Sequence, residues 1–512
     1  MVKLDNKKIL VIILVVYLIL KLTSFGYYFN GDEIDTYGPA RHFALIGETK
    51  VYDLSDGTPY YNITHPPLRT MLYSVWSFIF GFSDLTMRLV PIIFGVLVIF
   101  LTYLLGKELY SEKVGLIAAF LMTISRYFMY ASSIVNNDNT IFIFIFEAAI
   151  YFFIKYKKNL DNNYLILSSI FIVLSFLTKL TFILIIPSML ALSYLFGKDR
   201  IKKDFFVIVL ACLLPFLLLL GTSIAMNNPD IFDGPVSTAF KLSGRDQNVG
   251  AYLNDKLFYL SSFTWQATPF LAILLLISLL FNKRDKSHYF VSSWLLFVLI
   301  LLFLTSGLDY QRYVMIVLPP LFLLIAKQLE NFDFRNKLTY IVAIVLIIAS
   351  FFLGLNDMMG FYNPVIIGLF YAISVVFIIP KKYRNYLLVG GFIALSLYSI
   401  YPNVTIYSIG SYNVGELSNE ISDLGYPYNE VWATRDVFQY ITPSDESLTI
   451  NALPAMNEIN RDFIIENEIT YMSYYDYVHE DEINRLIEFC NDPHVIETNG
   501  RTTGFVCEVK TI

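Results

Sequence analysis

The chain has 512 residues, of which 56% are hydrophobic and only 16% are charged, and its mean hydropathy is +0.57. This composition excludes an ordinary water-soluble enzyme and predicts a protein with many membrane-spanning helices, because long apolar stretches recur along the sequence. The formal net charge of −6 is not that of a nucleic-acid-binding protein, so we expect no nucleic-acid partner.

Thirteen apolar segments are long enough and poor enough in charge to cross a membrane as helices. They lie near 9–26, 86–106, 114–134, 139–155, 163–179, 180–197, 205–226, 257–281, 288–307, 311–327, 338–356, 364–380 and 385–402. The first has no small-residue cleavage site near its end, so we interpret it as a retained anchor rather than a signal peptide. A fourteenth apolar segment, 66–82, begins with two prolines and carries Arg69, and its length alone does not decide whether it crosses.

The distribution of lysine and arginine between the loops decides the predicted topology. With thirteen spans and a cytoplasmic N-terminus, eighteen cations fall in inner loops and five in the outer loops after the first one. The eighteen are Lys107, Lys113, Lys155, Lys157, Lys158, Lys198, Arg200, Lys202, Lys203, Lys283, Arg284, Lys286, Lys327, Arg335, Lys337, Lys381, Lys382 and Arg384, and the five are Lys179, Lys241, Arg245, Lys256 and Arg312. This excess follows the positive-inside rule and would be reversed if 66–82 crossed. We therefore predict that 66–82 is an amphipathic helix on the outer surface, within a first outer loop at about 27–85.

The C-terminal residues 403–512 differ in character from the transmembrane domain predicted over 1–402. Charges return, and short β-rich runs such as "ITYMSYY" and "FVCEV" alternate with helical stretches such as "DEINRLIEFC". We expect a soluble, extracytoplasmic α/β domain, with a tight turn at "TNG", 498–500. Cys212 is expected to be a buried thiol; Cys490 and Cys507 can pair if the domain is extracytoplasmic, and the sequence leaves this open.

Acidic side chains lie at the predicted outer ends of two spans. Asp32 and Glu33 follow the first span, and Asp138 lies in the polar patch "SSIVNNDNT". A carboxylate at a partly desolvated interface is a candidate general base, although a solvated loop or a helix start is the ordinary explanation of the acidic pair taken alone. Asp32 and Asp138 together are candidates for holding a divalent cation or for orienting a sugar, and the metal question stays open.

Cationic groups are predicted at the same outer side. His65 precedes two prolines that favour a helix start, Lys179 lies between two apolar spans, and Arg312 begins another span. A buried lysine needs an anion or a route to the interface, and guanidinium binds phosphate in a bidentate manner. Each residue also has an ordinary explanation: His65 lies where a helix begins, Lys179 can contact lipid headgroups, and Arg312 can belong to the usual belt of interfacial residues. Glu147 is the acid in the middle of a span, where a functional and a structural role are equally expected.

The order of these motifs resembles one family. The acidic pair is followed by Tyr37 and Gly47, then by "HPPL" at 65–68, "RL" and "FG" at 88–89 and 94–95, "LTK" at 177–179, and "RY" at 312–313 before an "LPP" span. This set is similar to the protein O-mannosyltransferase and aminoarabinose-transferase superfamily over about residues 5–330. In that family "HPPL" is commonly continued by Gly-Lys, whereas Arg69 and Thr70 follow here.

The resemblance implies a GT-C fold: an α-helical polytopic membrane glycosyltransferase with its active site in the first outer loop. It implies a donor sugar on a polyprenyl or dolichyl phosphate and a hydroxyl acceptor on a protein, lipid or glycan. Asp32 is then the expected base, supported by Glu33 and Asp138. The residues expected to bind the donor phosphate are His65, Lys179, Arg312 and Arg69.

Two other classes of protein are alternatives to the glycosyltransferase. A transporter or flippase for polyprenyl-linked glycans should carry ionisable residues along a path near the bilayer midplane, whereas the spans here are nearly free of charge apart from Glu147. A sensor or scaffold with a ligand-binding C-terminal domain leaves the pattern at 30–68 unexplained. The expected location is the cell membrane, with a cytoplasmic N-terminus.

Overall fold

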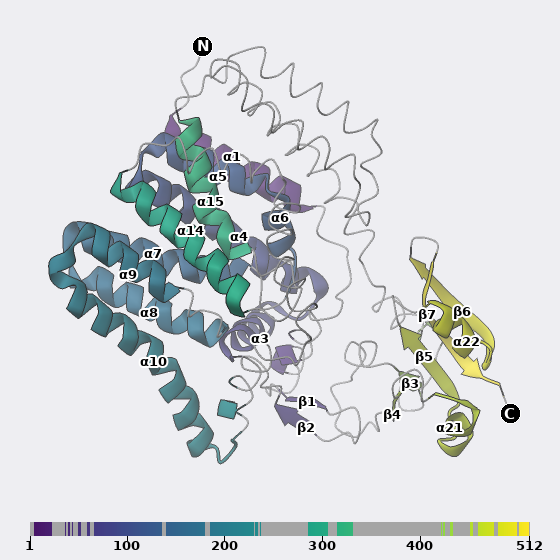
Figure 1. Ribbon diagram of the computed structural model, residues 1–512. Coiled ribbons are helices and arrows are strands. Elements are labelled where there is room, and N and C mark those ends of the chain that lie inside the picture. Colours follow the sequence, from purple (N-terminus) through teal and green to yellow (C-terminus); the bar gives the residue numbers. More distant parts are fainter. Residues whose placement is uncertain are drawn as a thin grey trace, which may run out of the picture.

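The computed structural model describes the chain in segments. The described residues are 5–22, 36, 39–40, 43–44, 50–52, 59–61, 66–135, 140–179, 185–229, 231–233, 236, 285–305, 315–330, 421, 423–424, 431–433, 451–453, 459–475, 480–498 and 501–510. They form a helical bundle and, near the C-terminus, a five-stranded sheet (Figure 1). The spans predicted at 257–281, 338–356, 364–380 and 385–402 lie outside the described residues.

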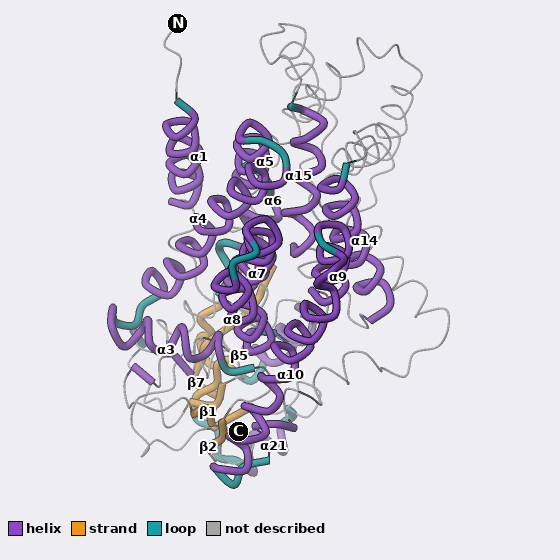
Figure 2. Tube along the Cα trace, turned by 90° about the vertical axis from the view of Figure 1, so that its left-hand side faces the viewer, coloured by secondary structure: helices purple, strands orange, loops and turns teal. Residues whose placement is uncertain are grey.

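The helices of the bundle, shown in Figure 2, pack around a large apolar core and a second, smaller apolar cluster. Their bounds are α1 Asn6–Lys21, α3 Leu68–Phe80, α4 Asp84–Leu109, α5 Glu112–Thr123, α6 Arg126–Ala131, α7 Thr140–Asn159, α8 Asn162–Thr178, α9 Ile185–Phe196, α10 Ile201–Ala225, α14 Lys286–Thr305 and α15 Leu318–Leu329. Two described segments are long and apolar enough to cross a membrane, Leu85–Leu109 in α4 and Ile201–Ala225 in α10, with hydropathies of 2.6 and 2.8. Most expected spans in the described part thus coincide with helices.

One segment that was expected to be a continuous helix is interrupted in the structure. The segment 114–134 was expected to be a single helix, but it is divided into α5 and α6 at Ile124 and Ser125. Ser125 begins the second helix, because its carbonyl oxygen accepts from the N–H of Met129 at 2.8 Å and its hydroxyl accepts from the N–H of Phe128 at 3.4 Å. Hydropathy does not reveal this break, since both flanking stretches are apolar.

Ion pairs and hydrogen bonds join helix ends at one side of the bundle, here called the charged face. Asn6 at the start of α1 donates to Glu112 at the start of α5 at 2.9 Å, and Lys155 near the end of α7 pairs with Glu108 near the end of α4 at 2.9 Å. Ser111 before α5 donates to the Glu330 carboxylate after α15 at 2.6 Å. The alternate helices therefore run in opposite directions, as in a multispan protein.

The opposite side of the bundle, here called the loop face, contains the end of α1 and the beginning of α4. Lys21 is the last residue of α1 and Arg88 lies near the start of α4, and both donate to Ser133. The chain between these helices consequently leaves and returns on the same face. This geometry agrees with the prediction that 66–82 alone does not cross. In the chain between α1 and α3, strands β1 (Lys50–Tyr52) and β2 (Pro59–Tyr61) form an antiparallel pair.

Helix α3 has two different faces. Its apolar side chains Met71, Val75, Phe78 and Ile79 are exposed, whereas Tyr73, Ser74 and Ser77 are among its buried residues. The buried side packs on α4 and α8, and the Trp76 indole donates to the Thr86 carbonyl oxygen at 2.8 Å. An apolar outer side on a short helix is the pattern of a helix that lies in a membrane interface.

A buried ion pair joins three helices near the charged face. The Lys157 ammonium of α7 lies 2.7 Å from the Asp204 carboxylate of α10, and both side chains are almost completely buried. The hydroxyl of Tyr156 donates to the same carboxylate at 3.0 Å, and the hydroxyl of Ser193 in α9 also donates to it. Lys157 was counted as a loop cation in the sequence, but it belongs to the core.

The C-terminal sheet has the strand order β4-β3-β5-β7-β6. Its strands are β3 Val431–Ala433, β4 Asn451–Ala452, β5 Tyr471–Tyr475, β6 Cys490–Thr498 and β7 Arg501–Val509. β3 pairs in parallel with β4 and β5, whereas β7 is antiparallel to β5 and β6. Thr498 pairs with Arg501 directly across the turn expected at "TNG". Two helices, α21 (Arg461–Glu466) and α22 (Glu480–Ile487), add apolar side chains to one face of the sheet.

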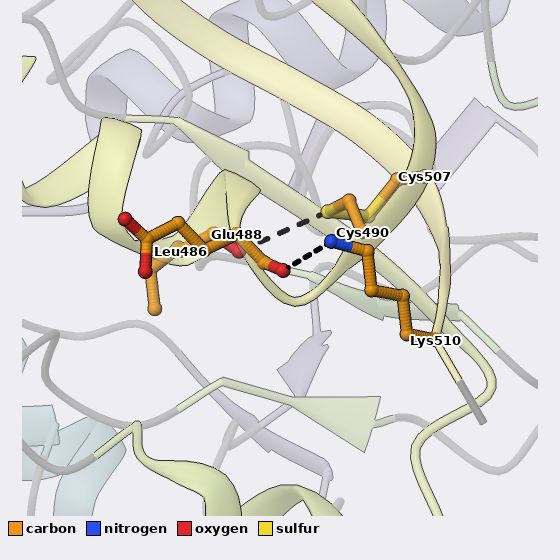
Figure 3. Close-up of a disulfide and its surroundings, with 5 residues drawn as sticks. All are labelled: Leu486, Glu488, Cys490, Cys507 and Lys510. Carbon is orange, nitrogen blue, oxygen red and sulfur yellow. Dashed lines mark hydrogen bonds between the residues drawn. A yellow bond between two sulfur atoms is a disulfide. The ribbon is translucent and has the colours of Figure 1, made fainter. Parts of the chain in front are cut away.

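A disulfide joins Cys490 of β6 to Cys507 of β7, with a Cα–Cα distance of 5.6 Å (Figure 3). Both cysteines are buried, and the Lys510 ammonium donates to the Glu488 carbonyl oxygen at 2.6 Å beside them. Cys212, as expected, is a buried free thiol. The pairing that the sequence left open is therefore present in the structure.

Candidate functional site

Two of the seven predicted site residues lie in the part of the chain that the structure describes. They are Arg69 and Lys179. The other five lie outside the described residues and remain predictions: Asp32, Glu33, His65, Asp138 and Arg312. The site can therefore be built from the helices that surround these positions.

Arg69 is placed by the start of α3. The two prolines of "HPPL" precede this helix as expected: Pro67 is its N-cap and its carbonyl oxygen accepts from the Met71 N–H at 2.9 Å. Arg69 is the second residue of α3 and only 4% exposed, although arginine normally keeps its head in water. Arg69 therefore places a guanidinium in a buried position at the first turn of α3.

Lys179 is placed by the end of α8. It is the C-cap residue, its backbone N–H donates to the Ser175 carbonyl oxygen at 2.9 Å, and it is 8% exposed. A cation at a helix C-terminus is favoured by the carbonyl groups that point out of that end. Since α8 packs against α3, Arg69 and Lys179 lie on two contacting helices, and both are buried.

Two further buried cations lie at the loop face. Lys21 and Arg88 are each 1% exposed. The Lys21 ammonium donates to the Met129 carbonyl oxygen and the Ser133 hydroxyl, and Arg88 Nη1 donates to the Ser133 carbonyl oxygen at 2.6 Å. The sequence interpretation gave neither residue a site role. The signal was available, because a charged residue inside an apolar span is a functional candidate by default.

The start of α4 is fixed by hydroxyl groups from its neighbours. The Tyr17 hydroxyl of α1 donates to the Ile92 carbonyl oxygen at 3.2 Å, and the Thr140 hydroxyl of α7 donates to the carbonyl oxygen of Pro91. Pro91 lies inside α4 and has no N–H to donate within the helix. Side-chain donors from α1 and α7 thus meet the backbone of α4 close to Arg88.

Glu147 lies apart from these cations, in the middle of α7. It is 0% exposed and accepts a hydrogen bond from the Thr102 hydroxyl of α4 at 2.7 Å. Its second carboxylate oxygen has no hydrogen-bond partner within the described segments. This contact joins α4 to α7, so the structure gives Glu147 at least a structural role.

The described residues contain no group of three or more His, Cys, Asp or Glu side chains that could hold a metal ion. Asp32 and Asp138, the predicted candidates, lie outside them. What the described part does offer is cationic: Lys21, Arg69, Arg88 and Lys179 are all buried toward the loop face. Such an arrangement stabilises an anion that reaches that face, because charges in a poorly hydrated site interact strongly.

Comparisons with known proteins agree with this architecture. The family described as dolichyl-phosphate-mannose-protein mannosyltransferase matches residues 64–223, a stretch that includes "HPPL", "RL", "FG" and "LTK" but neither the acidic pair nor "RY". No curated protein matches the chain in sequence.

Solved structures share the fold at low sequence identity. ArnT from Cupriavidus metallidurans bound to undecaprenyl phosphate has a TM-score of 0.63 and 12% identity over 97% of each chain. The same protein in the apo state has a TM-score of 0.63 and 13% identity, again over 97% of each chain. The archaeal oligosaccharyltransferase AglB from Archaeoglobus fulgidus, in complex with an inhibitory peptide and a dolichol-phosphate, has a TM-score of 0.52 and 15% identity over 98% of this chain and 74% of that chain.

The resemblance drawn from the order of the sequence motifs is confirmed by these matches. The chain therefore has the GT-C fold of these solved structures, and its residues 64–223 match the mannosyltransferase family.

Proposed function

We propose that the protein is an inverting glycosyltransferase that moves a sugar from a polyprenyl or dolichyl phosphate to a hydroxyl acceptor on the outer face of the membrane. One observation carries the proposal: buried cations gather at the loop face beside a helix whose outer side is apolar. A polyprenyl-phosphate sugar has a matching chemistry, with an anionic head at the interface and a hydrocarbon tail in the lipid.

The proposed reaction transfers one sugar and one proton. Asp32 takes the proton from the acceptor hydroxyl, whose oxygen attacks the anomeric carbon while the carbon–oxygen bond to phosphate breaks. Attack opposite the leaving phosphate inverts the anomeric carbon. Glu33 and Asp138 support the base. The leaving polyprenyl phosphate needs no proton if His65, Arg69, Lys179 and Arg312 stabilise its negative charge.

The proposed topology is thirteen spans, with a cytoplasmic N-terminus and the C-terminal domain, 403–512, outside. The charged face, with Lys155 and Lys158 on Glu108, is then cytoplasmic and the loop face is outer. The disulfide Cys490–Cys507 supports an outer C-terminal domain, because disulfides persist in oxidising compartments. The protein is thus proposed to be a multi-pass protein of the cell membrane.

Two similar structures support a polyprenyl-phosphate donor. One is ArnT bound to undecaprenyl phosphate, and another is AglB in complex with an inhibitory peptide and a dolichol-phosphate. The acceptor is proposed only as a hydroxyl group on protein, lipid or glycan, since the two structures differ in what they bind besides the lipid. Hexose and pentose donors both fit the proposed chemistry.

The first experiment measures binding of undecaprenyl phosphate and dolichyl phosphate to the full chain in lipid nanodiscs. Arg69→Gln and Lys179→Gln should each weaken binding by about tenfold, as expected when one cation is removed from a phosphate site. Lys203→Gln is the matched control, because Lys203 is exposed and, among the described residues, donates to the neutral side chain of Asn162 at 3.0 Å. Equal affinity in all variants would contradict the phosphate assignment.

The second experiment measures transfer from undecaprenyl-phosphate and dolichyl-phosphate sugars to hydroxyl acceptors. Asp32→Asn should abolish transfer while membrane insertion and phosphate binding persist, because the amide cannot take the proton. An Asp32→Asn variant with near-normal turnover would remove Asp32 as the base. If the labelled lipid crosses the bilayer and no sugar is transferred, the protein is a transporter and the proposed enzyme activity is refuted.

A further inference from the structure

Lys21 ends helix α1 in an unusual environment. Its side chain is 1% exposed, and its ammonium donates to the Met129 carbonyl oxygen of α6 and to the hydroxyl of Ser133, just after α6. Both acceptors are neutral. A cation buried in this way loses several kcal/mol of hydration that neutral acceptors restore only in part. Simple packing of α1 on α6 does not require a cation here.

Helix α1 is already held in the bundle without Lys21. At its start, Asn6 donates to Glu112 at 2.9 Å. Further along, the Tyr17 ring fits against Gly95 of α4, where an added Cβ would lie 1.9 Å from the Tyr17 hydroxyl oxygen. These contacts join α1 to α5 and α4. The bonds of Lys21 are different, because they are directed at α6 and the turn after it.

The two segments that Lys21 joins lead to the two acidic positions. The chain leaves α1 at Lys21 and reaches Asp32 eleven residues later, and it leaves Ser133 and reaches Asp138 five residues later. Arg88 holds the same Ser133 by its carbonyl oxygen at 2.6 Å. On the far side of Asp138, Thr140 donates to Pro91 of α4. The stretch 133–140 is therefore attached at both of its ends, and Lys21 links one of those ends to the exit of α1.

We propose that Lys21 is a positioning residue for transfer: it sets the relation between the exit of α1, which leads to Asp32, and the turn at Ser133, which leads to Asp138. The proposal rests on the proposed function, since it is stated for that reaction. Lys21 itself touches no reacting atom in this account. Its two hydrogen bonds, to Met129 and Ser133, fix both chain segments at once.

A distance measurement tests the proposal independently of any activity. Spin labels are attached to Ser24→Cys and Asn137→Cys in a Cys212→Ala background of the full chain, and the distance distribution is recorded in nanodiscs. Lys21→Met keeps an unbranched side chain of similar volume but removes the donors, so it should broaden or shift the distribution. Lys21→Arg keeps charge and donors and should restore it. Lys8→Met, at an exposed lysine of the same helix, is the matched control.

Kinetics with undecaprenyl-phosphate and dolichyl-phosphate sugars supply the second measurement. Lys21→Met should lower kcat by about 10- to 100-fold with KM for the donor within about twofold, because misplacement of catalytic groups by about 1 Å has effects of this size. Lys21→Arg should recover most of kcat. A purely structural role would lower the amount of folded protein and leave kcat per folded molecule unchanged.

The outcomes separate this proposal from the proposed function. If the wild type transfers no sugar, the proposed function fails, while the distance measurement still decides whether Lys21 sets the geometry. If distances and kcat are unchanged in Lys21→Met, the positioning role is refuted although the enzyme stands. Should Lys21→Met not fold, Ser133→Ala removes the hydroxyl acceptor and keeps the carbonyl acceptor of Arg88, and it should shift the same two measurements.

Discussion

Removing one partner of the buried pair between Lys157 and Asp204 should destabilise the bundle strongly. In Lys157→Met the Asp204 carboxylate stays buried and keeps the hydroxyl donors of Tyr156 and Ser193, but it loses the cation at 2.7 Å. Breaking a buried pair in this way costs about 3–5 kcal/mol, because the remaining charge is uncompensated. Replacing both residues, in Lys157→Met with Asp204→Leu, should recover most of that loss, since no charge then remains buried.

The free energy of unfolding is measured by titrating the detergent-solubilised full chain with a denaturing detergent and following helical circular dichroism. Lys203→Met on the same helix as Asp204 is the control and should cost about 0–1 kcal/mol, since its lysine is exposed. Lys157→Met, Asp204→Leu and the variant with both changes form a double-mutant cycle, whose coupling energy measures the interaction between Lys157 and Asp204. A cost for Lys157→Met no larger than that of the control would refute the reasoning.

Three further predictions concern other contacts. Cys490→Ser with Cys507→Ser should destabilise the C-terminal sheet by about 3 kcal/mol, the chain-entropy value for a sequence separation of 17, and limited proteolysis of oxidised and variant protein checks this. Hydrogen bonds from Lys327 and, secondly, from Ser111 hold the pKa of Glu330 below its ordinary value. The ionised Glu330 carboxylate therefore stabilises the fold at pH values above the ordinary pKa, and this contribution is lost as the pH falls below the ordinary pKa. The thermal midpoint of Glu330→Gln should accordingly depend less on pH in that acidic range than that of the wild type, and parallel curves would contradict this. Gly106→Val should reduce the yield of folded protein, because even a Cβ at Gly106 would lie 2.5 Å from the Gly115 Cα. Gly221→Val should not, because a Cβ at Gly221 would meet no atom of the described residues within 4 Å.

The positions of the spans could be predicted because an apolar helix must be about as long as the hydrocarbon is thick. The segment expected at 86–106 became α4, and that expected at 139–155 became α7. The direction of the chain after Ile124 could not be predicted in this way, since hydropathy reports burial and not the path of the backbone. The strands of the C-terminal sheet were predicted from short runs rich in β-forming residues, which is a local property, whereas the parallel pairing of β3 with β5 is not local.

The candidate site was predictable only where a residue type was unusual for its place. Arg69 and Lys179 attracted notice because each interrupts an apolar stretch, and the structure buries both. Lys21 and Arg88 interrupt such stretches as well, yet their meeting at Ser133 depends on three segments that are far apart in the sequence. The count of positive charges likewise treated Lys157 as a surface cation, because a count of charges cannot distinguish a solvated lysine from a paired one.

The two ends of the bundle use charge in different ways, and the difference bears on function. At the charged face several of the described cations pair with carboxylates: Lys155 and Lys158 with Glu108, Lys327 with Glu330, and Lys157 with Asp204. At the loop face the described acceptors of Lys21 and Arg88 are carbonyl and hydroxyl oxygens, which carry no net charge. A phosphate that comes close to buried cations interacts with them strongly, because charges in a poorly hydrated site are weakly screened. A phosphorylated lipid that binds at the loop face should therefore raise the unfolding temperature of the protein, and a neutral polyprenol should not.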